Sequence, residues 1–230
     1  MGSRKVNHGL YERPYGRLPG LGLLLAVCMY LAAVLLVLNR VLPGRLPAAA
    51  AARWHTVSPW LTGAAPGFIL VLLFGAAAKL SDCIVDKAGF LLSAAAAVCR
   101  ILDTLLPRLG LERPMAVPAA AAALLWWLLL AAAFLLFSVN RENTRDARRC
   151  AALTAPFLLL CFFGTAVVHQ GASMVVNARL DTAFRGLRLM EAGGQITFFS
   201  GIVACVLMGA TFLFLRTPTR AILYPKRLTE

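Results

Sequence analysis

Charged residues are scarce in this sequence, and acidic ones especially so. Asp, Glu, Lys and Arg together make up 14% of the 230 residues, and only 10 residues are acidic. Soluble domains carry about 25% charged residues, so the composition excludes an ordinary soluble domain. Hydrophobic residues reach 60%, and the mean hydropathy is +0.76. Because backbone polar groups in lipid must pair within their own segment, we expect an all-α, polytopic helical membrane protein.

Sequence motifs of enzymes and of metal sites are also missing. The chain contains no nucleophile elbow, no HExxH motif and no phosphate-binding glycine loop. None of the six cysteines forms a CxxC pair, and the three histidines, His8, His55 and His169, lie far apart in the sequence. Metal and haem sites need ligands that converge. We therefore expect no enzymatic activity, no cofactor and no metal site.

Long apolar runs define a membrane domain, 20–216, between a basic N-terminal tail, 1–19, and a basic C-terminal tail, 217–230. Four of the runs approach the roughly 20 residues that a helix needs to cross hydrocarbon. A fifth run, only about 15 residues long, needs a helical extension to do so. The predicted spans are residues 20–42, 66–80, 116–139, 151–169 and 196–215.

Residues 80–106 form an amphipathic segment that brings charge into the middle of the apolar chain. At 100° per residue, its polar and small side chains fall on one side of a helix and its aliphatic side chains on the other. We favour a polar edge that faces solvent or lipid headgroups over a stripe that lines a path for an ion or solute. The candidate polar stripe consists of Lys79, Asp82, Asp86, Ser93, Arg100 and Asp103.

Two acids of this stripe, Asp82 and Asp86, lie one helical turn apart. Such a pair could bind a cation or share a proton. Lys79 and Lys87 lie close enough in the sequence to neutralise both acids. We therefore favour a local ion-paired patch over a cation site.

A second amphipathic segment covers residues 178–192. Its apolar residues, which include Phe184 and Leu187, recur at helical spacing and are flanked by arginines. Gly193 and Gly194 follow the segment, and glycine is typical of helix ends. We predict a short surface helix that docks on the membrane surface or on another subunit.

Basic clusters outside the spans constrain the topology. They lie in the N-terminal tail, in the loop 141–149 and in the C-terminal tail. Short segments rich in Lys and Arg tend to stay on the cytoplasmic side, so the three clusters should share one side. Six crossings satisfy this condition without leaving residues 66–80 outside lipid, and we prefer six to the alternatives of four or five. The candidate headgroup-binding residues are Arg145, Arg148, Arg149, Arg220, Lys226 and Arg227.

Small residues indicate how the last span packs. Gly201, Cys205 and Gly209 recur at intervals of four and form a ridge of the kind that lets another helix approach closely. Helix-packing features of this type outnumber intramembrane polar groups in the sequence. They favour a packing role for the protein over a conducting one.

Two functions are compatible with these features. The favoured one is a non-catalytic membrane subunit or scaffold within a larger complex, and the alternative is a small ion or solute channel or transporter that uses the stripe at 79–103. Expected partners are anionic lipids, and either other membrane subunits or a second copy of the chain. Positive charge is spread over many loop ends, which argues against nucleic-acid binding. An intracellular membrane is expected, with the mitochondrial inner membrane as one candidate.

Overall fold

The computed structural model describes residues 18–81, 83–108, 112–141, 143–177 and 180–215. Within these ranges the chain is helical and has no strand, so the predicted all-α fold is confirmed. The elements are α1 (Leu18–Val41), η2 (Pro43–Arg45), α2 (Ala48–Pro59), the π-helical segment η3 (Trp60–Ala64), α3 (Ala65–Leu80), α4 (Ile84–Leu105), η4 (Leu106–Arg108), α5 (Glu112–Val139), α6 (Arg145–Asn177) and α7 (Leu180–Leu215).

Six helical stretches are long and apolar enough to cross a membrane, which confirms the preferred six crossings over four or five. The protein is therefore a polytopic helical membrane protein. The six spans are Gly20–Val41, Ala48–Leu80, Ile84–Arg108, Val117–Val139, Arg145–Val176 and Thr182–Leu215.

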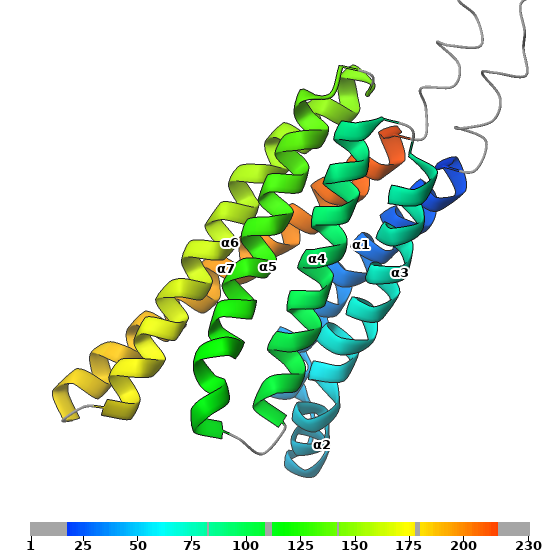
Figure 1. Cartoon of the computed structure of the whole chain (residues 1–230). Coiled ribbons are helices and arrows are strands. Elements are labelled where there is room, and N and C mark those ends of the chain that lie inside the picture. Colours follow the sequence, from blue (N-terminus) through cyan, green and yellow to red (C-terminus); the bar gives the residue numbers. More distant parts are fainter. Residues whose placement is uncertain (1–17, 82, 109–111, 142, 178–179, 216–230) are drawn as a thin grey trace, which may run out of the picture.

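Successive spans lie side by side, and the last span closes the bundle against the first. Figure 1 shows α3, α4, α5 and α6 following one another across the molecule, with α7 passing behind α5 toward α1. α1 contacts both α7 and α3. All six spans contribute buried side chains to the core.

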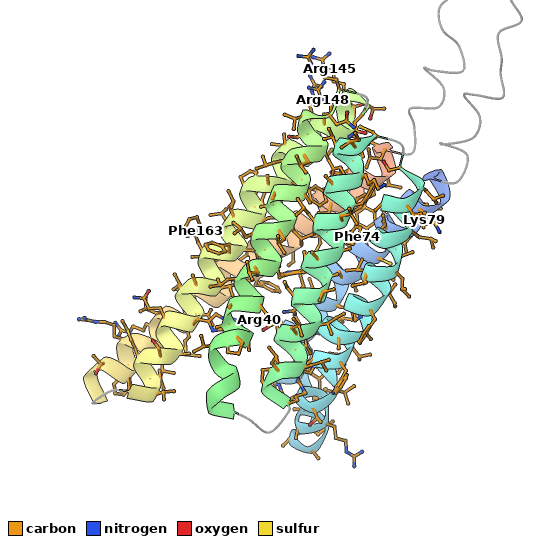
Figure 2. All side chains as sticks on the ribbon, viewed as in Figure 1. Arg40, Phe74, Lys79, Arg145, Arg148 and Phe163 are labelled. Atoms are coloured by element: carbon orange, nitrogen blue, oxygen red, sulfur yellow. The ribbon has the colours of Figure 1, made fainter. Side chains whose placement is uncertain are left out.

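The bundle has two distinct ends. α1 begins and α7 ends at the end where the links 81–83 and 140–144 also lie, and we call this the terminal end (Figure 1). Figure 2 shows Lys79, Arg145 and Arg148 there. The opposite end carries α2, the end of α6 and the start of α7. The basic loop 141–149 thus lies at the end from which both tails continue, as six crossings require.

The second span is much longer than predicted. It begins at Ala48 and continues through α2, η3 and α3 to Leu80, whereas the sequence predicted a run from 66 to 80 with an extension beyond it. The helix that precedes the predicted run contains Pro59, and Pro66 lies near the start of α3. The π-helical segment between them absorbs the backbone disruption that proline causes, so the helix continues through both.

Five phenylalanine rings from four helices form the core near the terminal end. Phe212 of α7 lies 5.6 Å from Phe134 of α5 and 5.9 Å from Phe74 of α3, measured between ring centroids. Phe90 of α4 lies 5.0 Å from Phe137 of α5. Tilted and edge-to-face ring pairs at such distances contribute about 0.5–1.5 kcal/mol each beyond burial. These contacts fix α7 against the centre of the bundle.

The predicted short surface helix at 178–192 is wrong, because α7 is continuous from Leu180 to Leu215. Gly193 and Gly194 lie inside this helix and do not end it. A Cβ atom at Gly193 would lie 2.5 Å from the carbonyl oxygen of Gly164 on α6. Glycine is therefore needed here for the close approach of two helices, and not for a helix end.

Candidate functional site

The uncharged polar side chains Ser93 and Thr104 of α4 face the interior of the bundle. Ser93 is 0% exposed and Thr104 is 6% exposed, whereas Leu91 and Val98 on the other face are 53% and 43% exposed. The favoured interpretation of a polar edge facing solvent or headgroups is therefore wrong for the uncharged part of the stripe, whereas Arg100 and Asp103 are partly exposed. A helix surrounded by lipid turns its aliphatic side outward and its polar side toward protein, which inverts the arrangement of a soluble amphipathic helix.

The charged members of the stripe belong to two separate clusters. The helix starts only at Ile84, so Lys79 lies on α3, where it is exposed, and Asp82 lies outside the described residues. Asp86 lies in the first turn of α4, and Arg100 lies about 21 Å further along the helix axis. Between them the hydroxyl of Ser93 donates to the carbonyl oxygen of Gly89 at 2.9 Å, which leaves this group satisfied within its own helix.

The cluster at the terminal end joins α4 to the link between α5 and α6. The side-chain amide of Asn143 donates to Asp86 at 3.0 Å and to the carbonyl oxygen of Phe137 at 3.1 Å. The amide of Asn140 lies 3.3 Å from the sulfur of Cys83. Sequence reasoning missed both asparagines, because a loop amide gives no signal until the fold brings a partner to it. These contacts hold the start of α4 against the link between α5 and α6.

The cluster at the opposite end is built on Arg100. Its guanidinium donates to Asp103 at 2.6 Å, one turn along α4. The hydroxyl of Thr104 donates to the carbonyl oxygen of Arg100 at 2.9 Å. Arg108 donates to the carbonyl oxygen of Thr104 and lies over the ring of Trp60, with 5.9 Å between the guanidinium carbon and the ring centroid. An arginine paired inside a membrane span marks a candidate functional site.

A cavity of about 290 Å³ opens beside this second cluster, between α1, α3, α5 and α7. Its wall is formed mainly by aliphatic and aromatic side chains, and Arg100 provides its charged group. The π-helical segment contributes Thr62 and Gly63, and π-helical turns occur frequently at functional sites. Sequence reasoning did not find this cavity, because its lining comes from five helices that are far apart in the chain.

Two tryptophans of α5 line the cavity near the middle of their span. The indole nitrogen of Trp127 donates to the hydroxyl of Thr165 on α6 at 3.0 Å. The indole nitrogen of Trp126 is buried and has no hydrogen-bond partner among the residues that the structure describes. Leaving a buried donor unpaired costs about 1–3 kcal/mol, so this atom needs an acceptor.

The predicted packing ridge on α7 faces α1 of the same chain. A Cβ atom at Gly209 would lie 2.8 Å from the ring of Tyr30, and one at Gly201 would lie 3.5 Å from Leu36. Cys205 is buried in the same interface and also lines the cavity. The ridge therefore packs two helices of one chain together and positions the cavity wall.

The ends of α6 and α7 at the opposite end form an arm, residues 170–177 and 180–195, that diverges from α5 (Figure 1). Glycines hold its two segments together. A Cβ atom at Gly171 would lie 2.6 Å from the carbonyl oxygen of Gly186, and the converse distance is 2.7 Å. Phe184 and Leu187, two of the apolar residues of the predicted docking segment, are exposed on its surface.

The candidate headgroup-binding residues differ in what the structure shows of them. Arg145 and Arg149 are exposed at the terminal end, whereas Arg148 donates from Nε to the carbonyl oxygen of Ser138 at 3.0 Å. Arg220, Lys226 and Arg227 lie outside the described residues. Arg145 and Arg149 are therefore free to contact lipid phosphates.

Comparison with known proteins adds no function to the fold. No protein-family model matches the chain, and no curated protein or solved structure is similar to it. All six cysteines are free thiols. In the part of the chain that the structure describes, no group of three His, Cys, Asp or Glu side chains could hold a metal ion. The six apolar helices define the class of the protein, an integral membrane protein with six spans.

Proposed function

We propose that the protein is a non-catalytic subunit or scaffold that binds another integral membrane protein through the α6–α7 arm. The observation that carries this proposal is the exposure of Phe184 and Leu187, at 63% and 52%, on an arm that diverges from the rest of the bundle. Arg185 and Arg188 are exposed beside them. Large apolar side chains bordered by charge are the pattern of a protein interface.

The lengths of α6 and α7 support an arm outside the hydrocarbon. The two helices contain 33 and 36 residues, which correspond to about 50 Å, and the hydrocarbon core is only about 30 Å thick. The excess coincides with the polar residues Gln170, Ser173 and Gln195. The exposed arginines suit a partner whose interface is acidic around an apolar centre. The proposed setting is an intracellular membrane, with the mitochondrial inner membrane as one candidate.

The test compares two double variants of the full chain. Phe184→Ser with Leu187→Ser removes the apolar centre of the arm, and Val41→Ser with Val57→Ser alters two exposed residues elsewhere near the same end of the bundle. In mild detergent, the first variant should run at the mass of the single chain and the second at the wild-type mass. Both should unfold at the wild-type temperature, because the altered side chains are exposed. A wild-type native mass for the arm variant would contradict the proposal.

The alternative, a channel or transporter that uses the stripe of α4, has weaker support. Its charged ends are separated by Ser93, which bonds its own helix, and by Phe90 of the aromatic core. A conducting path would need polar groups along this stretch. Selective flux through vesicles that contain only the purified protein, lost in Asp86→Asn, would favour the alternative.

A further inference from the structure

The cavity beside Arg100 has the chemistry of a lipid site. We propose that it holds one acyl chain of an anionic phospholipid, with the phosphate at Arg100. The proposal goes beyond the scaffold function, because the site lies inside the bundle and the docking arm lies outside it.

The size and lining of the cavity match one acyl chain. Its volume of about 290 Å³ lies at the lower limit of the roughly 300–1,000 Å³ typical of small-molecule sites. This is room for a single chain and not for a complete two-chain lipid. Leu36, Leu70 and Met208 are among the side chains that line it, and Met208 can adapt to the shape of a flexible chain. The second acyl chain would remain in the bilayer.

Arg100 lies inside its span, and its long side chain can carry the guanidinium outward toward the level of the lipid phosphates. The residue lies five residues before the end of α4, about 8 Å inside the helix end. Its side chain is 31% exposed and uses Nη1 to contact Asp103. A guanidinium has five N–H donors in a planar fork, so others remain for a phosphate oxygen. The ion pair holds the fork in one orientation, which lowers the entropy lost on binding.

Two further cations keep this region net positive although Asp103 neutralises one charge. Arg108 lies two turns beyond Arg100 along the same helix direction, and Arg45 belongs to η2 at the same end. A zwitterionic headgroup gains less from this field, because its cationic group offsets the attraction of its phosphate, whereas an anionic headgroup gains the full attraction. The charge therefore selects an anionic phospholipid over a neutral phospholipid with the same chains.

Trp126 is an independent indication of an absent polar ligand. Its ring lines the cavity, and its indole nitrogen is buried without an acceptor among the described residues. Phospholipids carry ester carbonyl oxygens between the phosphate and the acyl chains. Such a carbonyl is an acceptor that the hydrocarbon region otherwise lacks. A lipid chain that enters the cavity would bring this acceptor with it.

The first experiment measures contact between lipid chains and the cavity tryptophans. The chain has four tryptophans, so Trp54→Phe with Trp60→Phe leaves only Trp126 and Trp127 as fluorophores. This protein is reconstituted in neutral phosphatidylcholine vesicles with increasing amounts of phosphatidylglycerol that carries brominated chains, and separately with brominated phosphatidylcholine. Half-maximal quenching should need about tenfold less of the anionic lipid, because the positive charges of Arg100, Arg108 and Arg45 attract a net negative headgroup more strongly than a zwitterionic one.

Two variants assign the preference to the cavity. Arg100→Gln with Asp103→Asn leaves the net charge unchanged but removes the guanidinium that holds the phosphate within the field of Arg108 and Arg45, and it should lower the roughly tenfold preference. Ala32→Phe fills the cavity from α1 and should abolish quenching by both lipids, whereas the control Ala95→Phe places the same ring on the exposed face of α4. The control should behave as the wild type. Native mass spectrometry of the wild-type protein should detect one retained anionic phospholipid.

The outcomes distinguish a phospholipid from a free fatty acid and from free inorganic phosphate as the occupant of the site. Equal quenching by the two phospholipids, or an unchanged preference in the double variant, would overturn the proposal. Preferential quenching by brominated oleate with none by brominated phosphatidylglycerol would overturn the phospholipid as occupant. Competition by inorganic phosphate without any effect of chain length would do the same. If Ala32→Phe fails to fold, native mass spectrometry of the Arg100 double variant still tests the proposal. Loss of the retained lipid would support it, and retention of the lipid would contradict it.

Discussion

At the scale of single residues, glycine determines how closely the helices approach. Gly193 and Gly194 are neighbours in α7, yet only the first is needed for contact with α6. A Cβ atom at Gly193 would lie 2.5 Å from a backbone oxygen of Gly164, whereas one at Gly194 would meet no atom within 4 Å. Backbone cannot move aside as a flexible side chain can, so the two positions should respond differently to the same substitution.

The pair Gly193→Ala and Gly194→Ala tests this difference. Both substitutions gain the same helix propensity, so the comparison isolates the steric term. We expect Gly193→Ala to be about 1–3 kcal/mol less stable than Gly194→Ala, because it forces α6 and α7 apart. Thermal unfolding in detergent, followed by circular dichroism, measures the difference. Equal stability of the two variants would show that the helices are not in backbone contact at Gly193.

At the scale of elements, α4 shows why a pattern alone leaves orientation undetermined. The sequence correctly separated a polar side from an aliphatic side, and the structure places these on opposite faces of the helix. Which face is outside depends on the surroundings, since water attracts the polar side and lipid the aliphatic side. Leu91 and Val98 therefore point to lipid, and Ser93 and Thr104 point to protein.

Aspartate substitutions should reveal this orientation. Leu91→Asp and Val98→Asp place charge inside the hydrocarbon, and each should cost about 2.5–3.5 kcal/mol of insertion free energy at the centre of a span. Ile84→Asp is the matched control, because Ile84 is exposed at the first residue of α4, where negative charge also favours the helix dipole. The fraction of inserted protein, measured by protease protection, should fall for the first two variants only. Normal insertion of Val98→Asp would place this face toward water.

The bounds of a helix can be predicted from sequence when the residues of that helix alone determine them. The apolar runs of α1 and α5 define their spans locally, so their positions followed from sequence. The extent of the second span did not, since the π-helical segment at Trp60–Ala64 carries the helix past two prolines, a local geometry that sequence patterns do not reveal. The cavity also could not be predicted, because Arg100 and Trp126 meet only through long-range packing.

At the scale of the whole molecule, the crossing of α4 decides the topology. α3 ends at Lys79 and Leu80 at the terminal end, and α6 begins at Arg145 at the same end. Two crossings, α4 and α5, separate these positions. The positive charges of the loop 141–149 and of both tails then share one side, which the distribution of Lys and Arg predicts to be cytoplasmic.

Single cysteines at three exposed positions test this topology. Lys79→Cys, Arg145→Cys and Arg53→Cys are each introduced into a chain whose six native cysteines are replaced by alanine. In sealed vesicles of one orientation, an impermeant maleimide should label positions 79 and 145 from the same side and position 53 from the other, because Arg53 and Lys79 lie near opposite ends of the second span. Circular dichroism and gel filtration establish that the cysteine-free chain retains its helices. If α4 lay along the membrane surface, only α5 would separate the two positions, and cysteines at 79 and 145 would react from opposite sides. This experiment thus detects a change of one crossing, which native mass or helical content would not register.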